Sequence, residues 1–104
     1  MIEVKNIFSN ISSNTKDEIL ETLVRNESCK IERIISNTHS TEKNKWYDQD
    51  KNEFVLLLKG SAELLFFPNE LIKLKEGDYL IIPSHKKHRV EKTAEETIWL
   101  TVFY

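Results

Sequence analysis

Glycine and proline are scarce in this chain of 104 residues, which contains two of each. A single cysteine, Cys29, excludes an internal disulfide framework and any cysteine-rich zinc module. The longest apolar run, Phe54 to Leu58, is far too short for a membrane-spanning helix of ~20 residues. The first residues lack the basic and apolar segments of a signal peptide, and we therefore expect a cytoplasmic protein.

The composition is that of a soluble globular protein of one domain. Hydrophobic residues make up 39% of the chain and charged residues 31%, so the chain is too apolar to be disordered. The net charge of −2 argues against a nucleic-acid partner. The sequence has no glycine-rich phosphate loop and no His-Glu-x-x-His motif, which leaves nucleotide-binding and zinc-protease functions without support.

The N-terminal part carries a helix signal. Thr15 and Glu18 form a capping box, in which the two side chains satisfy backbone N–H groups of the first helical turn. The apolar residues that follow fall at helical spacing: Ile19, Leu20, Leu23 and Val24. The sequence therefore predicts a short helix over residues 15–25.

Short strands are predicted for the rest of the chain, because runs of apolar and β-branched residues are separated by turn residues. The predicted ranges are 29–36, 53–59, 62–67, 71–75, 78–82, 88–92 and 97–104. Such close spacing is typical of an all-β sandwich or small barrel. Outward-facing Phe54, Leu56 and Leu58 predict a covered second face, with either a second copy or the N-terminal segment over it.

Two spacing patterns contain both glycines. They read Glu53-x6-Gly60 and Gly77-x5-Pro83-x-His85-x2-His88. These patterns resemble the two signature motifs of the cupin superfamily, and the match covers roughly residues 29–104. The resemblance implies a double-stranded β-helix, which is a small β-barrel, with residues 1–28 as a helical extension of a single cupin domain.

The residue types in the two patterns suit the implied fold. We expect Gly60 at the tip of a hairpin, where the backbone needs a positive φ. Pro83 ends a strand without the loss of a hydrogen bond in the ladder. If the sheet curls into a barrel, Glu53 and His88 point into its mouth, where small barrels hold a ligand.

The resemblance also implies a metal centre of three histidines and one glutamate, which this chain keeps only in part. Glu53 and His88 match their motif positions, but the histidines of the first motif are replaced. Depending on the gap, their positions fall at Trp46 and Asp48 or at Tyr47 and Gln49. The expected ligands of one divalent ion (Fe, Mn, Ni or Zn) are Glu53, His88 and Asp48, with Gln49 and His85 as substitutes. The alternative is a hydrogen-bonded Glu53–His88 pair without a metal.

A small-molecule site in the barrel is the leading functional hypothesis. The expected substrate contacts are Trp46, Tyr47, Gln49 and His85. One alternative, offered by the resemblance, is a metal-dependent enzyme similar to sugar isomerases, epimerases or dioxygenases, with His88, His85 and Glu53 as candidate catalytic residues. Another is a non-catalytic sensing or binding module. The resemblance also implies a possible homodimer that pairs through its sheets.

Overall fold

The computed structural model describes residues 1–11 and 17–104, and these residues contain eight β-strands. The strands are β1 (Ile19–Arg25), β2 (Lys30–Ser36), β3 (Glu53–Lys59), β4 (Ser61–Phe66), β5 (Glu70–Lys75), β6 (Tyr79–Ile82), β7 (His88–Thr93) and β8 (Thr97–Phe103). The prediction of an all-β fold is confirmed. In the described part of the chain, no helix is long and apolar enough to cross a membrane.

The predicted N-terminal helix is wrong. Residues 19–25 form β1, which pairs with β2 from Ile19 opposite Ile35 to Arg25 opposite Lys30. A β-bulge between Thr22 and Val24 breaks the two-residue alternation of this strand, so its apolar residues fall at spacings that resemble those of a helix. Residues 15 and 16, which begin the predicted helix, lie outside the described residues.

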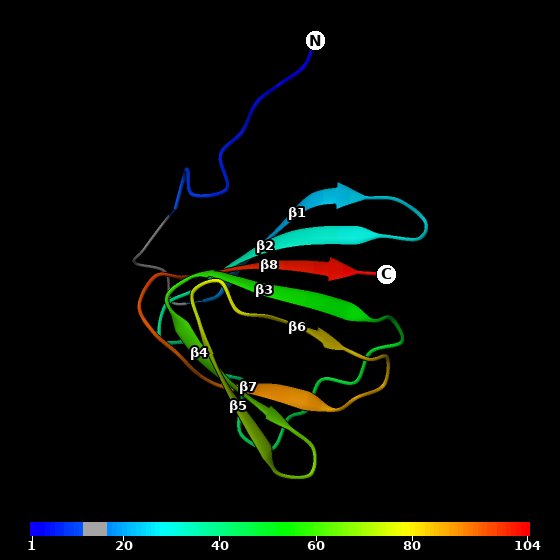
Figure 1. The fold of residues 1–104 in the computed structure, drawn as a ribbon, viewed down its shortest axis with the longest axis vertical. Coiled ribbons are helices and arrows are strands. Elements are labelled where there is room, and N and C mark those ends of the chain that lie inside the picture. The colour runs from blue at the N-terminus through cyan, green and yellow to red at the C-terminus, as the bar shows by residue number, and fades with distance from the viewer. Residues whose placement is uncertain (12–16) are drawn as a thin grey trace.

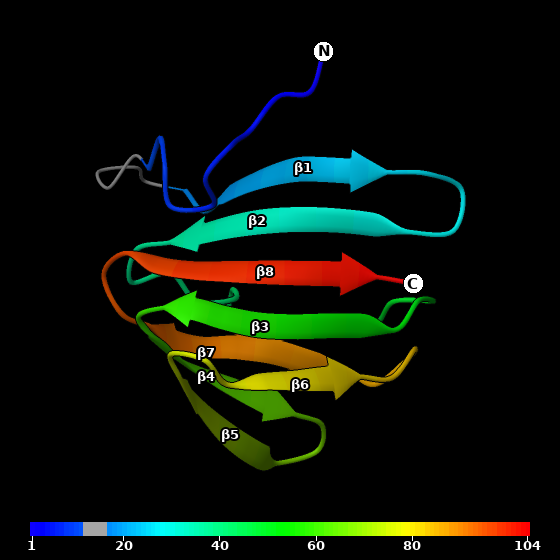
Figure 2. The same ribbon diagram turned by 45° about the horizontal axis from the view of Figure 1, so that its top comes forward.

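The strands form two antiparallel sheets that face each other (Figures 1 and 2). One sheet has the order β1-β2-β8-β3-β6 and the other the order β5-β4-β7. The predicted strands from residue 29 onward agree with the observed ones to within one residue at each end. The turn residues therefore marked the strand ends correctly.

The core lies between the two sheets and is built from alternate residues of each strand. In β3, Val55 and Leu57 are buried, whereas Phe54 and Leu56 are half-buried on the outer face. The buried cluster consists of Val55, Leu57, Ala62, Leu64, Phe66, Leu74, Ile82 and Trp99. This alternation leaves room for polar side chains only where the inner face reaches the end of the sandwich.

Gly60 lies where the chain crosses from one sheet to the other. Its neighbours β3 and β4 belong to different sheets, so the predicted hairpin is wrong. The predicted positive φ is confirmed, with a value of 90°. A Cβ atom at this position would lie 2.5 Å from Oγ1 and 2.9 Å from Cα of Thr97, so only glycine fits the crossing.

Arg33 of β2 ties the N-terminal segment to the outer face of the five-stranded sheet. Its buried guanidinium donates from Nη1 to the backbone oxygens of Ile7, at 3.0 Å, and Ser9, at 2.7 Å. The residues before this attachment extend away from the body (Figure 1), and Ile2 and Val4 are 92% and 93% exposed. The chain therefore carries an apolar arm beside an apolar sheet face.

Candidate functional site

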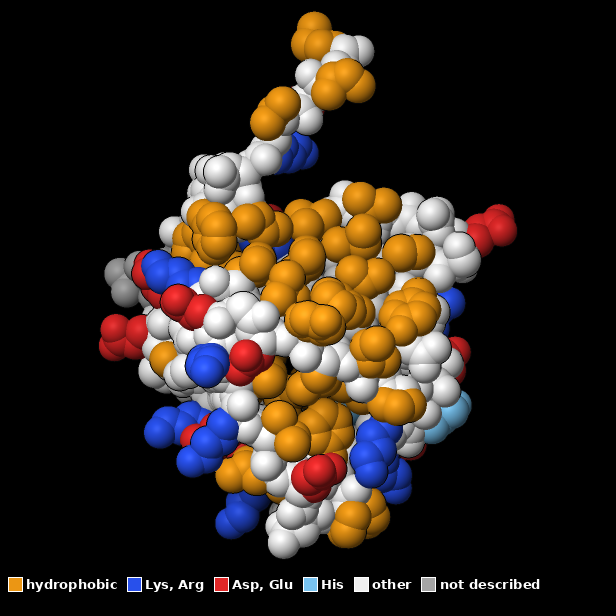
Figure 3. Space-filling model, viewed as in Figure 1, with side chains coloured by type: hydrophobic (Ala, Val, Ile, Leu, Met, Phe, Trp, Pro, Cys, Tyr) orange, Lys and Arg blue, Asp and Glu red, His pale blue; other side chains and the backbone are white. Residues whose placement is uncertain are grey.

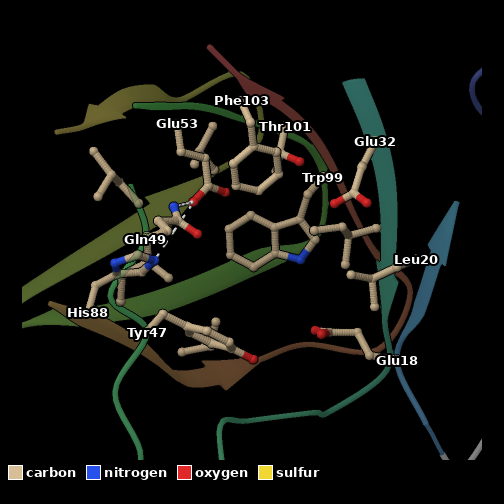
Figure 4. Close-up of a pocket in the computed structure, with 15 residues that line it drawn as sticks. Glu18, Leu20, Glu32, Tyr47, Gln49, Glu53, His88, Trp99, Thr101 and Phe103 are labelled. Atoms are coloured by element: carbon tan, nitrogen blue, oxygen red, sulfur yellow. Dashed lines mark hydrogen bonds and ion pairs between the residues drawn. The ribbon is translucent and has the colours of Figure 1, made fainter. Parts of the chain in front are cut away.

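A pocket of about 140 Å³ opens between the two sheets (Figure 4). Its apolar wall includes Leu20, Ile34, Val55, Leu64, Val90 and Phe103. Its polar side chains are Glu18, Glu32, Gln49, Glu53, His88 and Thr101, and the aromatic rings of Tyr47 and Trp99 lie among them. The pocket is thus an apolar cavity in which several hydrogen-bonding groups converge.

Glu53 of β3 and His88 of β7 meet in this pocket. His88 Nε2 lies 3.7 Å from Glu53 Oε1, and their side chains are only 7% and 10% exposed. The other ring nitrogen, Nδ1, lies 2.9 Å from the backbone oxygen of Lys86. Because a carbonyl oxygen only accepts, Nδ1 donates to Lys86 O, and Nε2 is the ring nitrogen that faces Glu53.

The Glu53 carboxyl is held in an environment that disfavours its charge. Burial raises the pKa of Glu53 above its usual value of 4.5, and the negative charge of Glu32 acts in the same direction. A hydrogen bond from Gln49 Nε2 to Glu53 Oε1, 2.7 Å long, opposes this shift, as do the positive charges of His88 and Lys30. The net result is a raised pKa, so the protonated form of Glu53 persists to higher pH than in an exposed glutamate.

The loop before β3 closes the pocket through its backbone. Tyr47 N donates to His88 O at 2.8 Å, and His88 N donates to Tyr47 O at 3.1 Å. Tyr47 and Gln49 both line the pocket. In this extended segment alternate side chains point the same way, so Tyr47 and Gln49 face inward together.

Trp46, Asp48 and His85 are not among the lining residues of the pocket. The Trp46 ring packs edge-on against Phe67, with centroids 5.4 Å apart. Asp48 Oδ1 lies 2.9 Å from His85 Nδ1, in a pair whose side chains are 41% and 68% exposed. Of the predicted substrate contacts, the structure therefore brings only Tyr47 and Gln49 to Glu53 and His88.

The chain matches one family model, whose description is that of a cupin domain, over residues 36–103. That range covers more than half of the chain. The chain belongs to the cupin family. No significant match is found among curated proteins.

Solved structures share the fold of this cupin. A protein of Ralstonia eutropha JMP134, provisionally named a mannose-6-phosphate isomerase, is 34% identical over 98% of this chain and 97% of its own, with a TM-score of 0.94. A cupin superfamily protein of Desulfitobacterium hafniense DCB-2 is 19% identical over 89% and 82%, with a TM-score of 0.77. An RmlC-like cupin of Shewanella frigidimarina NCIMB 400 is 14% identical over 83% and 74%, with a TM-score of 0.71.

The side chains of the pocket do not fit the metal centre that the family implies. Glu53 and His88 come together, but Asp48 is engaged by His85 at the surface. Among residues 1–11 and 17–104, no group of three His, Cys, Asp or Glu side chains is arranged to hold a metal ion. A tight transition-metal site normally has at least three protein ligands, whereas in the described residues only Glu53 and His88 come together, and the Gln49 amide is bound to Glu53.

Sequence reasoning did not find the second polar region of the pocket, formed by Glu18, Glu32, Trp99 and Thr101. The Trp99 indole N–H donates to Ser36 Oγ at 3.1 Å, and the Ser36 hydroxyl donates to Glu18 Oε2 at 2.6 Å. Glu32 is buried on the inner face of β2. The sequence offered no clear signal for Glu32, because β2 reads Lys-Ile-Glu-Arg-Ile-Ile-Ser and other charged residues surround this glutamate.

Proposed function

We propose that this cupin binds a small molecule in the pocket between its sheets. The observation that carries the proposal is the buried Glu53–His88 pair at the polar end of an apolar cavity. A cavity of ~150 Å³ is large enough for a benzene-sized compound. The apolar wall supplies contact area, while His88 Nε2 and the Glu53 carboxyl supply directed hydrogen bonds.

The charges of the pocket disfavour a phosphorylated ligand. Its described lining residues include three glutamates and no lysine or arginine. A phosphate group would lose its hydration shell there without gaining a counter-charge. The provisional name of the Ralstonia eutropha relative is therefore not carried over to this chain as an activity on a sugar phosphate.

The proposal is tested by a screen of small neutral, cationic and anionic compounds in which the indole N–H signal of Trp99 is followed by NMR. Replacement of Trp46 by Phe removes the only other indole signal. We expect binders to shift the Trp99 signal, and Glu53→Gln to weaken them. Asp48→Asn, outside the pocket, is the matched control and should leave binding unchanged. Compounds that bind without any effect on Trp99 would show that the site is elsewhere.

A metal-free enzyme is the second candidate, and the state of Glu53 and His88 favours it. Burial raises the pKa of Glu53, and Lys86 O fixes the tautomer of His88, so one group can donate a proton while the other accepts one. Isomerisation by proton transfer needs these two roles at adjacent positions. Turnover of a pocket ligand that Glu53→Gln and His88→Gln both abolish would distinguish this function from binding or sensing alone.

We further propose that this cupin forms a homodimer through the outer face of its five-stranded sheet. Figure 3 shows hydrophobic side chains gathered over these strands. On this face Tyr79, Ile81 and Val24 are 66%, 56% and 50% exposed, an apolar surface of the kind that marks an interface. The arm with Ile2 and Val4 starts from the same face. Under a two-fold axis, the arm of each copy can cover the face of the other.

A further inference from the structure

We infer that the ligand of this pocket carries a protonated amine. The inference rests on the proposed function, namely that the pocket binds a small molecule. It adds the chemical class of that molecule. Three observations carry it: the carboxylates of the pocket, a buried hydroxyl without a partner and an aromatic wall.

The carboxylates come from three separate segments and converge on one cavity. Glu18 precedes β1, Glu32 lies in β2 and Glu53 in β3, and all three line the pocket. Lys30 is not among the lining residues, but its Nζ lies 3.6 Å from Glu32 Oε2, and its side chain is 34% exposed. Even when Glu53 is protonated, Lys30 alone does not balance the carboxylates of Glu18 and Glu32, so the cavity attracts positive charge.

Thr101 adds a buried hydroxyl to this set. In the register of β2 and β8 it lies directly opposite Glu32, and it lines the pocket. The residue is 1% exposed, and Oγ1 has no hydrogen-bond partner among the described residues. A buried polar group without a partner costs stability. An ammonium group has three donors, so it can satisfy Thr101 Oγ1 and the Glu32 carboxylate together.

The ring of Trp99 supplies the third element. Figure 4 shows the indole between Glu32 on one side and Glu53, Gln49 and His88 on the other. The hydrogen bond from Trp99 Nε1 to Ser36 fixes its position. A tryptophan face is the strongest aromatic partner of a cation, and the attraction grows when water is excluded. Carboxylate, hydroxyl and indole thus form one site for an organic cation.

The inference is tested with three compounds of one skeleton: benzylammonium, benzyl alcohol and benzoate. They differ in charge at nearly equal size, and each is titrated while the Trp99 indole N–H signal of the Trp46→Phe protein is followed. We expect benzylammonium to bind about ten-fold more tightly than benzyl alcohol, and benzoate to bind most weakly.

Two variants test whether Glu32 and Thr101 bind the ammonium group. Glu32→Gln should weaken benzylammonium about five- to ten-fold and leave benzyl alcohol unchanged. Thr101→Val should weaken the binding of benzylammonium a few-fold. It provides a second test if the Glu32→Gln protein does not fold. Glu70→Gln removes an exposed carboxylate of β5 that does not line the pocket, and it should have no effect. Equal or tighter binding of benzyl alcohol or benzoate would overturn the amine inference and leave the proposed function intact. No shift with any of the three would count against both.

Discussion

His88 Nε2 and Glu53 Oε1 face each other at 3.7 Å, a distance too long for a direct hydrogen bond. Each side chain has another partner, since His88 Nδ1 donates to the Lys86 backbone oxygen and Glu53 Oε1 accepts from the Gln49 amide. The two groups are thus fixed but not joined. A hydroxyl or amine of a ligand placed beside them could bond to both, as the proposed binding function requires.

The raised pKa of Glu53 predicts a pH-dependent stability. The folded chain binds this proton more tightly than the unfolded chain, so the contribution of Glu53 to the free energy of unfolding is complete below pH 4.5. It is lost as the pH rises through the raised pKa. Glu53→Gln lacks this loss and should become progressively more stable relative to the parent protein as the pH rises from 4.5 through the raised pKa of Glu53.

The measurement is urea unfolding of both proteins across that pH range. The neighbours of Glu53, namely Gln49, His88, Glu32 and Lys30, are present in both proteins, so the difference between the two curves reports this carboxyl together with its interactions with them. Glu70→Gln, which removes an exposed carboxylate, should follow the parent protein at every pH. Parallel curves for the parent protein and Glu53→Gln would contradict the raised pKa.

The two-donor pocket predicts weak metal binding. Protein purified without a histidine tag should keep its melting temperature after dialysis against a chelator. In the described residues no third His, Cys, Asp or Glu side chain is grouped with Glu53 and His88, and the Gln49 amide is bound to Glu53. Added Fe, Mn, Ni or Zn should raise that temperature by about 1 °C or less. A stoichiometric metal that survives dialysis and is lost in His88→Ala would contradict this prediction.

A pair of buried threonines predicts opposite effects of one substitution. Thr101 Oγ1 has no partner among the described residues, so Thr101→Val should stabilise the fold by about 1 kcal/mol. Thr97 Oγ1 donates to Ala94 O at 2.9 Å, so Thr97→Val should destabilise it by about 1–2 kcal/mol. Both are measured by urea unfolding. A Thr101→Val protein as destabilised as Thr97→Val would mean that the Thr101 hydroxyl is satisfied in solution.

The strands from residue 29 onward were predictable because each ends at a turn residue that the sequence displays. β1 was not, since its bulge between Thr22 and Val24 disguises the alternation and its pairing with β2 is a tertiary effect. The crossing at Gly60 was misread for a related reason. A positive φ is visible in a glycine, but the sheet that the next strand joins depends on partners far along the chain.

The candidate site was predictable where a motif contained it and not elsewhere. The spacing patterns named Glu53 and His88, which the fold brings together. Glu32 and Thr101 meet only through the register of β2 and β8, which no local pattern encodes. The inward or outward direction of residues 46–49 depended on the backbone bridge between Tyr47 and His88.

The outer sheet face predicts a dimer that depends on the arm. Light scattering of the purified protein should give twice the chain mass of 12.3 kDa. Ile81→Glu places a charge on an apolar residue that is 56% exposed on this face, and it should weaken association by at least about ten-fold. Removal of residues 1–6 should weaken association as well, because the apolar surface of Ile2 and Val4 is then lost.

Leu71→Glu is the matched control for the dimer, because it introduces the same charge at a residue that is 47% exposed on β5 of the other sheet. It should leave the mass unchanged. If Leu71→Glu dissociates the dimer and Ile81→Glu does not, the interface lies on the three-stranded sheet. If the dimer persists without residues 1–6 but is lost in Ile81→Glu, the interface includes the sheet face and does not include the arm. A monomer at every accessible concentration would contradict the proposed homodimer, because association removes the apolar surface of this face from water.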